Sequence, residues 1–128
     1  MRGDPNDHAA WFRFAENDLE RATRMLADQD LEGGMFYLQQ ACEKHLKGKL
    51  IEKGWKLKRI HDIPELLNEA RARGVVTPVT DETASMLAVE YIAGRYPSTI
   101  LDPEPTRAQA QACFDQVSEK IHQPLGGS

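Results

Sequence analysis

Apolar residues recur along the chain at the three- and four-residue spacing that is typical of amphipathic helices. In residues 8–28 the apolar positions run from Trp11 to Leu26, and charged residues such as Glu16 and Glu20 lie between them. Because an α-helix turns once about every 3.6 residues, positions at this spacing share one side of the helix. The pattern therefore predicts a first helix over residues 8–28 that buries its apolar face.

Four further helices are predicted from the same spacing and from residues that commonly begin or end a helix. Glycine is favoured just past a helix C-terminus, and proline disfavours helical geometry in the residue before it. No stretch of the chain shows the sustained alternation of a β-strand. The expected bounds are a second helix from Gly33-Gly34 to Gly54, a third from Asp62 to Gly74, a fourth from about Thr80 to Pro97, and a fifth that begins after Thr106 with Gln109 in a capping box.

These segments predict an all-α fold, an up-and-down helical bundle of four to five helices with short antiparallel connections. They cover about 85 residues, far above the one third that is usual for helix in globular proteins. A chain of 128 residues suits one domain. We expect residues 8–123 to form the bundle, residues 1–7 to be a flexible N-terminus, and residues 124–128 to be a flexible C-terminal tail.

Composition excludes several classes of protein. A mean hydropathy of −0.55, with no apolar run near the roughly 20 residues that cross a bilayer, excludes a transmembrane helix and a membrane partner. The N-terminus lacks the apolar stretch of a secretory signal. The only two cysteines, Cys42 and Cys113, fit a reducing compartment, so we expect a cytoplasmic protein. The net charge of −4 argues against a protein that is basic throughout.

Polar residues interrupt the apolar faces of three predicted helices. At about 100° per residue, Gln40, Glu43 and Lys47 fall on the inner face of the second helix, whereas His45 falls on the solvated side. Asp18 and Glu90 hold inner positions on the first and fourth helices. Burying such groups costs several kcal/mol each unless they are paired. We therefore expect the inner polar residues to converge on one polar network or one cleft.

Three interpretations of the inner polar residues stay open. They can satisfy one another, as the favourable i,i+4 order of Glu43 and Lys47 allows, with the rest at the wet edge of a subunit interface. They can instead line a cleft for a ligand or a partner. Carboxylates also bind divalent metals, but nothing in the spacing fixes a ligand geometry. We predict no metal site and no cofactor.

A basic window extends from residue 44 to residue 59. Seven cations against Glu52 give it a net charge of +6, so the remaining residues carry −10. Trp55 lies inside the window and His61 follows it, an arrangement that suits phosphate contact and base stacking. The alternative is a solvated helix end whose cations favour the helix dipole. Apart from Lys47, the cations form a predicted basic patch of Lys44, Lys49, Lys53, Lys56, Lys58 and Arg59.

Three motifs, taken in order, resemble a known family. They are Gln39-Gln40-Ala41-Cys42-Glu43-Lys44-His45-Leu46-Lys47, then His61-Asp62, then Tyr91 followed by Arg95-Tyr96-Pro97. Over residues 11–122 the chain resembles the HEPN domain (higher eukaryotes and prokaryotes nucleotide-binding). The resemblance implies a helical bundle that is usually a homodimer. It further implies either a partner of a small nucleotidyltransferase, in a toxin–antitoxin-like pair, or a metal-independent endoribonuclease.

The ribonuclease motif of that family is incomplete in this chain. In the ribonuclease members an arginine is followed, after four to six residues, by a histidine, and the pair is completed across the dimer. Arg95 matches the arginine, but the histidine positions hold Ile100, Leu101 and Asp102. Without an imidazole the site lacks its usual general acid or base near neutral pH. We therefore expect no ribonuclease activity.

Together these observations favour a non-catalytic, dimeric module that binds a nucleotide or nucleic acid. The alternatives are a divergent endoribonuclease using Arg95, Tyr96 and Asp102, and a purely structural dimerisation protein. Lys47 and Arg95 are the expected phosphate contacts, and Tyr91 or Tyr96 the expected stacking partner. The candidate ligand-binding residues are Asp18, Gln40, Glu43, Lys47, His61, Tyr91, Arg95 and Tyr96.

Overall fold

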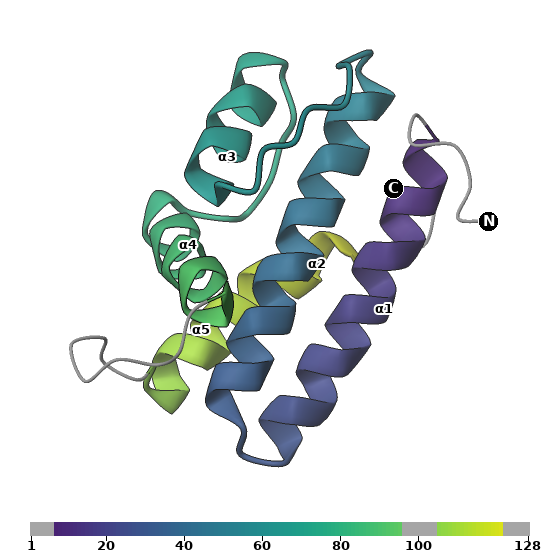
Figure 1. The fold of residues 1–128 in the computed structure, drawn as a ribbon. Coiled ribbons are helices and arrows are strands. Elements are labelled where there is room, and N and C mark those ends of the chain that lie inside the picture. The colour runs from purple at the N-terminus through teal and green to yellow at the C-terminus, as the bar shows by residue number, and fades with distance from the viewer. Residues whose placement is uncertain (1–6, 96–104, 122–128) are drawn as a thin grey trace.

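In the residues that the structure describes, the chain forms five helices and no strands. The computed structural model describes residues 7–95 and 105–121, with residues 89–95 described by their backbone alone. This all-α bundle confirms the predicted fold class (Figure 1). The helices are α1 (His8–Ala27), α2 (Leu31–Glu52), α3 (Ile63–Ala72), α4 (Asp81–Arg95) and α5 (Arg107–Ile121).

The start of α2 differs from the prediction, because the helix begins before the two glycines. The Asp30 carboxylate caps the first turn and accepts a hydrogen bond of 2.9 Å from the Gly33 backbone N–H. Gly34 lies against the end of α1, where an added Cβ would come within 2.4 Å of Leu26 Cδ2. Gly34 therefore permits a close contact between α2 and α1, and the two glycines do not end the preceding connection.

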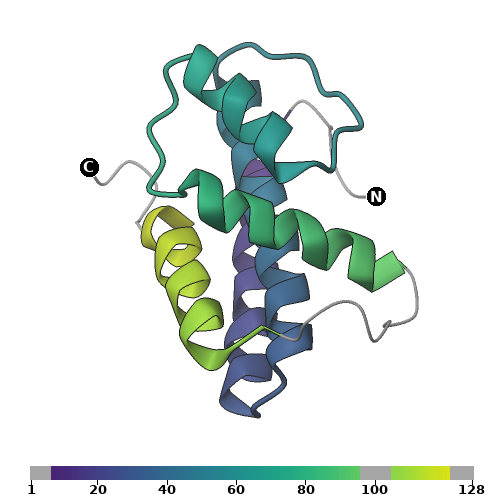
Figure 2. The same cartoon turned by 90° about the vertical axis from the view of Figure 1, so that its left-hand side faces the viewer.

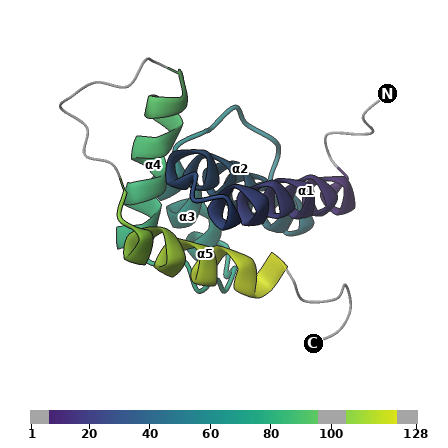
Figure 3. The same cartoon turned by 90° about the horizontal axis from the view of Figure 1, so that it is seen from below.

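The long helices α1 and α2 form an antiparallel hairpin, and α2 contacts all four other described helices (Figure 1). α4 lies across the hairpin rather than along it, as the two turned views show (Figures 2 and 3). α3 packs against α2 and α4, and α5 packs against α2 and α1. α2 is thus the central element, which explains why its apolar positions point in several directions.

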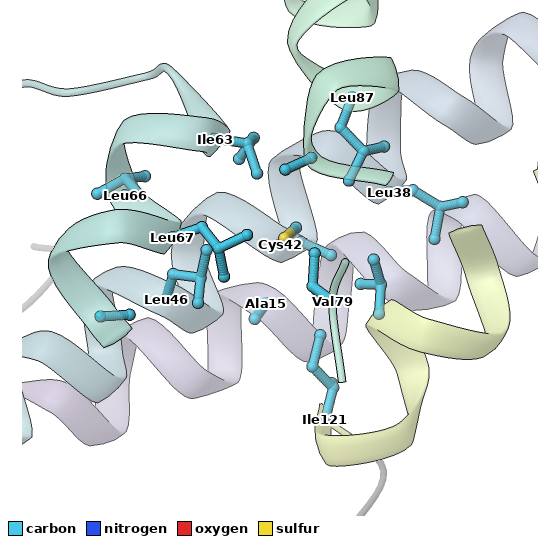
Figure 4. Close-up of a cluster of buried hydrophobic side chains, with 14 of the residues drawn as sticks. Ala15, Leu38, Cys42, Leu46, Ile63, Leu66, Leu67, Val79, Leu87 and Ile121 are labelled. Carbon is cyan, nitrogen blue, oxygen red and sulfur yellow. The ribbon is translucent and has the colours of Figure 1, made fainter. Parts of the chain in front are cut away.

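A single apolar core fills the space around α2. Side chains from α2, including Leu38 and Leu46, meet Leu67 of α3, Leu87 of α4 and Ile121 of α5 (Figure 4). Burying one such side chain stabilises the fold by about 1.5–3 kcal/mol. In the part of the chain that the structure describes, no helix is both long enough and apolar enough to cross a membrane.

The connection between α2 and α3 covers residues 53–62, longer than the two to eight residues usual between bundle helices. Its second residue, Gly54, has φ +90°, a left-handed conformation that glycine adopts without strain. The Trp55 backbone N–H then donates a 3.0 Å hydrogen bond to the Leu50 carbonyl. Figure 1 shows the connection leaving the end of α2 and turning back toward the start of α3.

Candidate functional site

Glu43 is the centre of a buried polar cluster on α2. The residue is only 5 % exposed. Glu43 Oε2 accepts a hydrogen bond from Lys47 Nζ at 2.9 Å, and His61 Nδ1 also lies 2.9 Å from Oε2. Gln39 Nε2 donates to the other oxygen, Oε1, at 3.1 Å. Both carboxylate oxygens are therefore bonded within the protein, and the i,i+4 pair of Glu43 and Lys47 forms.

Lys47 is enclosed by this cluster and by α1. The residue is 3 % exposed, and its Nζ lies 5.7 Å from the centre of the Trp11 ring. The ammonium charge is thus offset by the Glu43 carboxylate on one side and by the face of an indole on the other. This burial supports a structural role for Lys47 in place of the expected contact with an exposed phosphate.

The cluster also contains a residue that the sequence reasoning missed. Gln39 is fully buried, and its Oε1 accepts a 2.7 Å hydrogen bond from Nε2 of the half-buried Gln40. The helical pattern predicts an inner position for Gln40 but not for Gln39. The spacing of four between Gln39 and Glu43 was the signal that could have identified the buried glutamine, because residues i and i+4 are neighbours on a helix.

Asp18 forms a second group that is separate from the Glu43 cluster. It is 3 % exposed, and its carboxylate accepts hydrogen bonds from Arg21 Nη1 at 2.8 Å and from Lys44 Nζ. Lys44 follows Glu43 by one residue, and a rotation of about 100° along α2 turns it toward α1. Among the described inner residues, one shared network is therefore not formed: Asp18 and Glu43 belong to two separate hydrogen-bonded groups.

The basic patch is also divided. Lys44 bonds Asp18, and Lys49 Nζ lies 4.0 Å from Glu52 Oε1 and 5.4 Å from the centre of the Phe12 ring. The remaining four cations are exposed, and none of their side chains has a hydrogen bond or ion pair with any residue in the described ranges. We call them the outer cations: Lys53, Lys56, Lys58 and Arg59.

Trp55 does not lie among the outer cations as a stacking surface, and that expectation is wrong. The residue is 3 % exposed and belongs to the apolar core. Its indole Nε1 is buried and has no hydrogen-bond partner among the described residues. The large apolar area of an indole favours burial wherever the chain passes close to a core, whatever the charge of its neighbours in sequence.

Side chains alternate in direction along the α2–α3 connection. Trp55 lies in the core and Leu57 and Ile60 pack against it, whereas Lys56, Lys58, Arg59 and His61 are exposed. The Ile60 backbone N–H donates to the Lys58 carbonyl at 2.9 Å, which makes a tight turn centred on Arg59. Contacts at both ends hold the connection: Trp55 with Leu50, and His61 with Glu43.

The sequence was compared with models of known protein families. A family model described as the HEPN domain matches residues 8–124, nearly the whole chain. The chain belongs to the HEPN family. No curated protein and no solved structure matches it.

In this HEPN domain, residues 39–47 of α2, here called the HEPN string, contribute to the interior. Of its nine residues, the polar ones at 39, 43 and 47 are buried in the Glu43 cluster, and Lys44 joins α2 to α1 through Asp18. The string therefore positions helices as well as carrying the likeness to the family. The predictions for Glu90, Tyr91 and Arg95 fall on side chains outside the described residues, as does the prediction for Tyr96.

His45 and Cys42 of the HEPN string lie on the other side of α2. His45 was expected on the solvated side, but it is half-buried, with its ring centre 5.5 Å from that of Phe12. Burial lowers the pKa of His45 to about 4, and the nearby charges of Lys49 and Lys120 act in the same direction. The imidazole is therefore neutral at pH 7.

The thiol of Cys42 is equally inert near neutral pH. Burial raises its pKa to about 12, with Cys113 and Glu43 adding to the effect. Together with His45, Cys42 lines a small pocket between α2, α5 and the α3–α4 connection. Nowhere in residues 7–88 and 105–121 do three His, Cys, Asp or Glu residues gather in a way that would hold a metal ion.

Proposed function

We propose that this HEPN domain is a non-catalytic module that binds the phosphates of nucleic acid or nucleotides through the outer cations. The observation that carries the proposal is that Lys53, Lys56, Lys58 and Arg59 are exposed and have no counter-charge among the described residues. Lysine and arginine side chains in this state attract phosphate, and the release of the condensed counterions drives binding.

The buried groups support the assignment of phosphate binding to the connection. Lys44 and Lys47 are the cations of the HEPN string, and each is bonded to a carboxylate that is itself buried. An incoming phosphate would have to compete with Asp18 for Lys44 or with Glu43 for Lys47, and the buried carboxylate would lose part of its charge compensation. The outer cations require no such exchange.

The family suggests the assembly in which this binding takes place. We propose that the chain forms a homodimer and partners a small nucleotidyltransferase in a toxin–antitoxin-like pair, as the HEPN likeness implies. Light scattering coupled to size-exclusion chromatography tests the homodimer, and a mass of one chain would contradict it. Co-expression with the product of a neighbouring nucleotidyltransferase gene tests the partnership, and separate elution of the two proteins would contradict it.

Fluorescence anisotropy with a labelled 20-nucleotide RNA tests phosphate binding. We expect the double variant Lys58→Gln/Arg59→Gln to bind about tenfold more weakly at low salt, because it removes two phosphate contacts. The matched control is Arg13→Gln/Arg24→Gln, which removes two exposed cations from α1. Equal losses in the two variants, or no binding by the unmodified protein, would overturn the proposal.

The alternative of a divergent endoribonuclease is tested in the same samples. Gel analysis of the labelled RNA is expected to show no cleavage by the unmodified protein. Cleavage that is lost in Arg95→Ala would establish the ribonuclease instead, because a contaminating nuclease would act on RNA equally in both preparations. The alternative of a purely structural dimer requires that no nucleotide or nucleic acid binds at all.

A further inference from the structure

We infer that the α2–α3 connection binds the backbone of a nucleic-acid duplex and reads no bases, an inference that rests on the proposed function and adds the class of nucleic acid to it. The feature behind it is the alternation of side chains between residues 53 and 61. Every apolar or aromatic side chain of this stretch points inward, namely Trp55, Leu57 and Ile60. The exposed side chains are the four outer cations and His61.

This exposed surface lacks the groups with which proteins usually bind single strands. Sequence-tolerant binding of single strands combines cations with aromatic side chains on which bases stack, worth about 1–3 kcal/mol per base. Trp55 is the aromatic residue of the connection, and the core holds it. The His61 ring is 46 % exposed but is fixed through Nδ1 by the buried Glu43 carboxylate. A single strand would therefore gain phosphate contacts here without the stacking that normally accompanies them.

The connection presents its cations from a fixed backbone. The Trp55 backbone bonds Leu50 at one end, and His61 contacts Glu43 at the other. Leu50 and Glu43 are separated by about 10 Å along the axis of α2. The connection between Trp55 and His61 therefore runs back beside this rigid helix. A duplex also holds its phosphates in fixed rows. Binding between two ordered surfaces loses less conformational entropy than ordering a flexible strand does.

Acidic residues limit the length of this surface. Glu52 precedes it and lies near Lys49 and His8, and the exposed Asp62 follows it at the start of α3. Between them there are four cations and no carboxylate. With up to four phosphate contacts per protomer, the logarithm of the association constant should fall with the logarithm of salt concentration with a slope of about −3 to −4.

Anisotropy titrations with three probes test this inference. The probes are an A·U-rich 20-base-pair RNA duplex, a G·C-rich duplex of equal length, and the unstructured single strand U20. We expect the duplexes to bind within about twofold of each other and about tenfold more tightly than U20, because phosphates are the only groups contacted. Lys56→Gln should reduce the salt slope by about 0.9, and the control Arg13→Gln should leave it unchanged.

The outcomes separate this inference from the proposed function. Binding of U20 as tight as that of the duplexes would overturn the inference and leave phosphate binding intact, since stacking would then have to come from other residues. A preference above tenfold between the duplexes would also overturn it, because it would show base reading. Binding of none of the three probes would overturn both. Circular dichroism of each variant confirms that the surface substitutions leave the helices folded.

Discussion

Glu43 shows at the level of single residues how this HEPN domain uses polar groups inside its bundle. Three side chains bond its carboxylate, from positions four residues before it, four residues after it, and across the α2–α3 connection. Removing one partner of a buried ion pair leaves the other charge without compensation, which commonly costs about 3–5 kcal/mol. We therefore expect substitutions at different members of the cluster to lower the free energy of unfolding by different amounts.

We expect Glu43→Gln to lower the free energy of unfolding by about 3–5 kcal/mol, since Lys47 then remains buried without a counter-charge. Lys47→Met should lower it by less, because His61 still contacts the Glu43 carboxylate. Urea denaturation at pH 7 measures both values. A larger loss for Lys47→Met than for Glu43→Gln would contradict the geometry.

The Lys47→Met variant also separates a structural role from a binding role. Its affinity for RNA should equal that of the unmodified protein, because Lys47 is enclosed by Glu43 and Trp11. Loss of RNA binding by a folded Lys47→Met variant would return Lys47 to the phosphate site that its place in the HEPN string first suggested.

The double variant Glu43→Leu/Lys47→Met, which removes both charges, should recover part of the free energy of unfolding that Glu43→Gln loses.

His45 gives the fold a dependence on pH. Its pKa in the folded protein is about 4, below the usual histidine value of 6.5. Between these values the unfolded chain binds the proton more readily, so stability falls as pH decreases from 6.5 toward 4. The full contribution is at most about 3 kcal/mol. We expect His45→Gln to lose less stability than the unmodified protein over this range in urea denaturation. Parallel pH profiles for the two proteins would refute this role for His45.

How far single residues could be predicted depended on their separation in sequence. The Glu43–Lys47 pair followed from helical spacing, since i,i+4 neighbours meet in any helix. The bond from Lys44 to Asp18 joins residues 26 apart on different helices, and only the packing of α1 on α2 determines it. Trp55 was misplaced for a related reason. A local run of charge does not tell which side of an irregular connection faces the core.

Among the helices, most bounds were predictable and one start was not. The starts of α1, α3, α4 and α5 lie within about one residue of the predicted positions. At α1, α4 and α5 the side chain of the residue before the helix caps the first turn, and capping acts locally. At α5 the capping box forms as expected, with Thr106 N–H bonding Gln109 Oε1 at 2.9 Å and Gln109 N–H bonding Thr106 Oγ1 at 3.1 Å. The start of α2 was missed because Gly34 serves contact between helices, which local rules do not reveal.

Gly48 marks the second close contact between α1 and α2. An added Cβ would lie 2.5 Å from Phe12 Cε1 and 3.2 Å from Trp11 Cβ. Alanine favours helix over glycine by up to about 1 kcal/mol, but overpacking typically costs about 1–3 kcal/mol. We expect Gly48→Ala to lower the free energy of unfolding, measured in urea. In a Phe12→Ala background the cost of Gly48→Ala should shrink, and an unchanged cost would show that the Phe12 ring is not the obstacle.

For the molecule as a whole, the position of α2 makes unfolding a collective event. α2 contacts every other described helix, and the core around it draws side chains from all five. Cys42 of α2 and Cys113 of α5 lie in this core as buried thiols. A thiol reagent can reach them only when the helices separate. The rate of modification should therefore report the opening of the whole bundle rather than local fraying.

We expect neither thiol to react with a disulfide reagent at pH 8 in the absence of denaturant, because both are buried and burial raises the pKa of the Cys42 thiol to about 12. In urea, both should react over the same concentration range in which far-ultraviolet circular dichroism is lost. The variants Cys42→Ala and Cys113→Ala each leave one thiol and assign the signals. Reaction of Cys113 well before the loss of helix would show that α5 separates from the α1–α2 hairpin first, and the bundle would then not unfold as one unit.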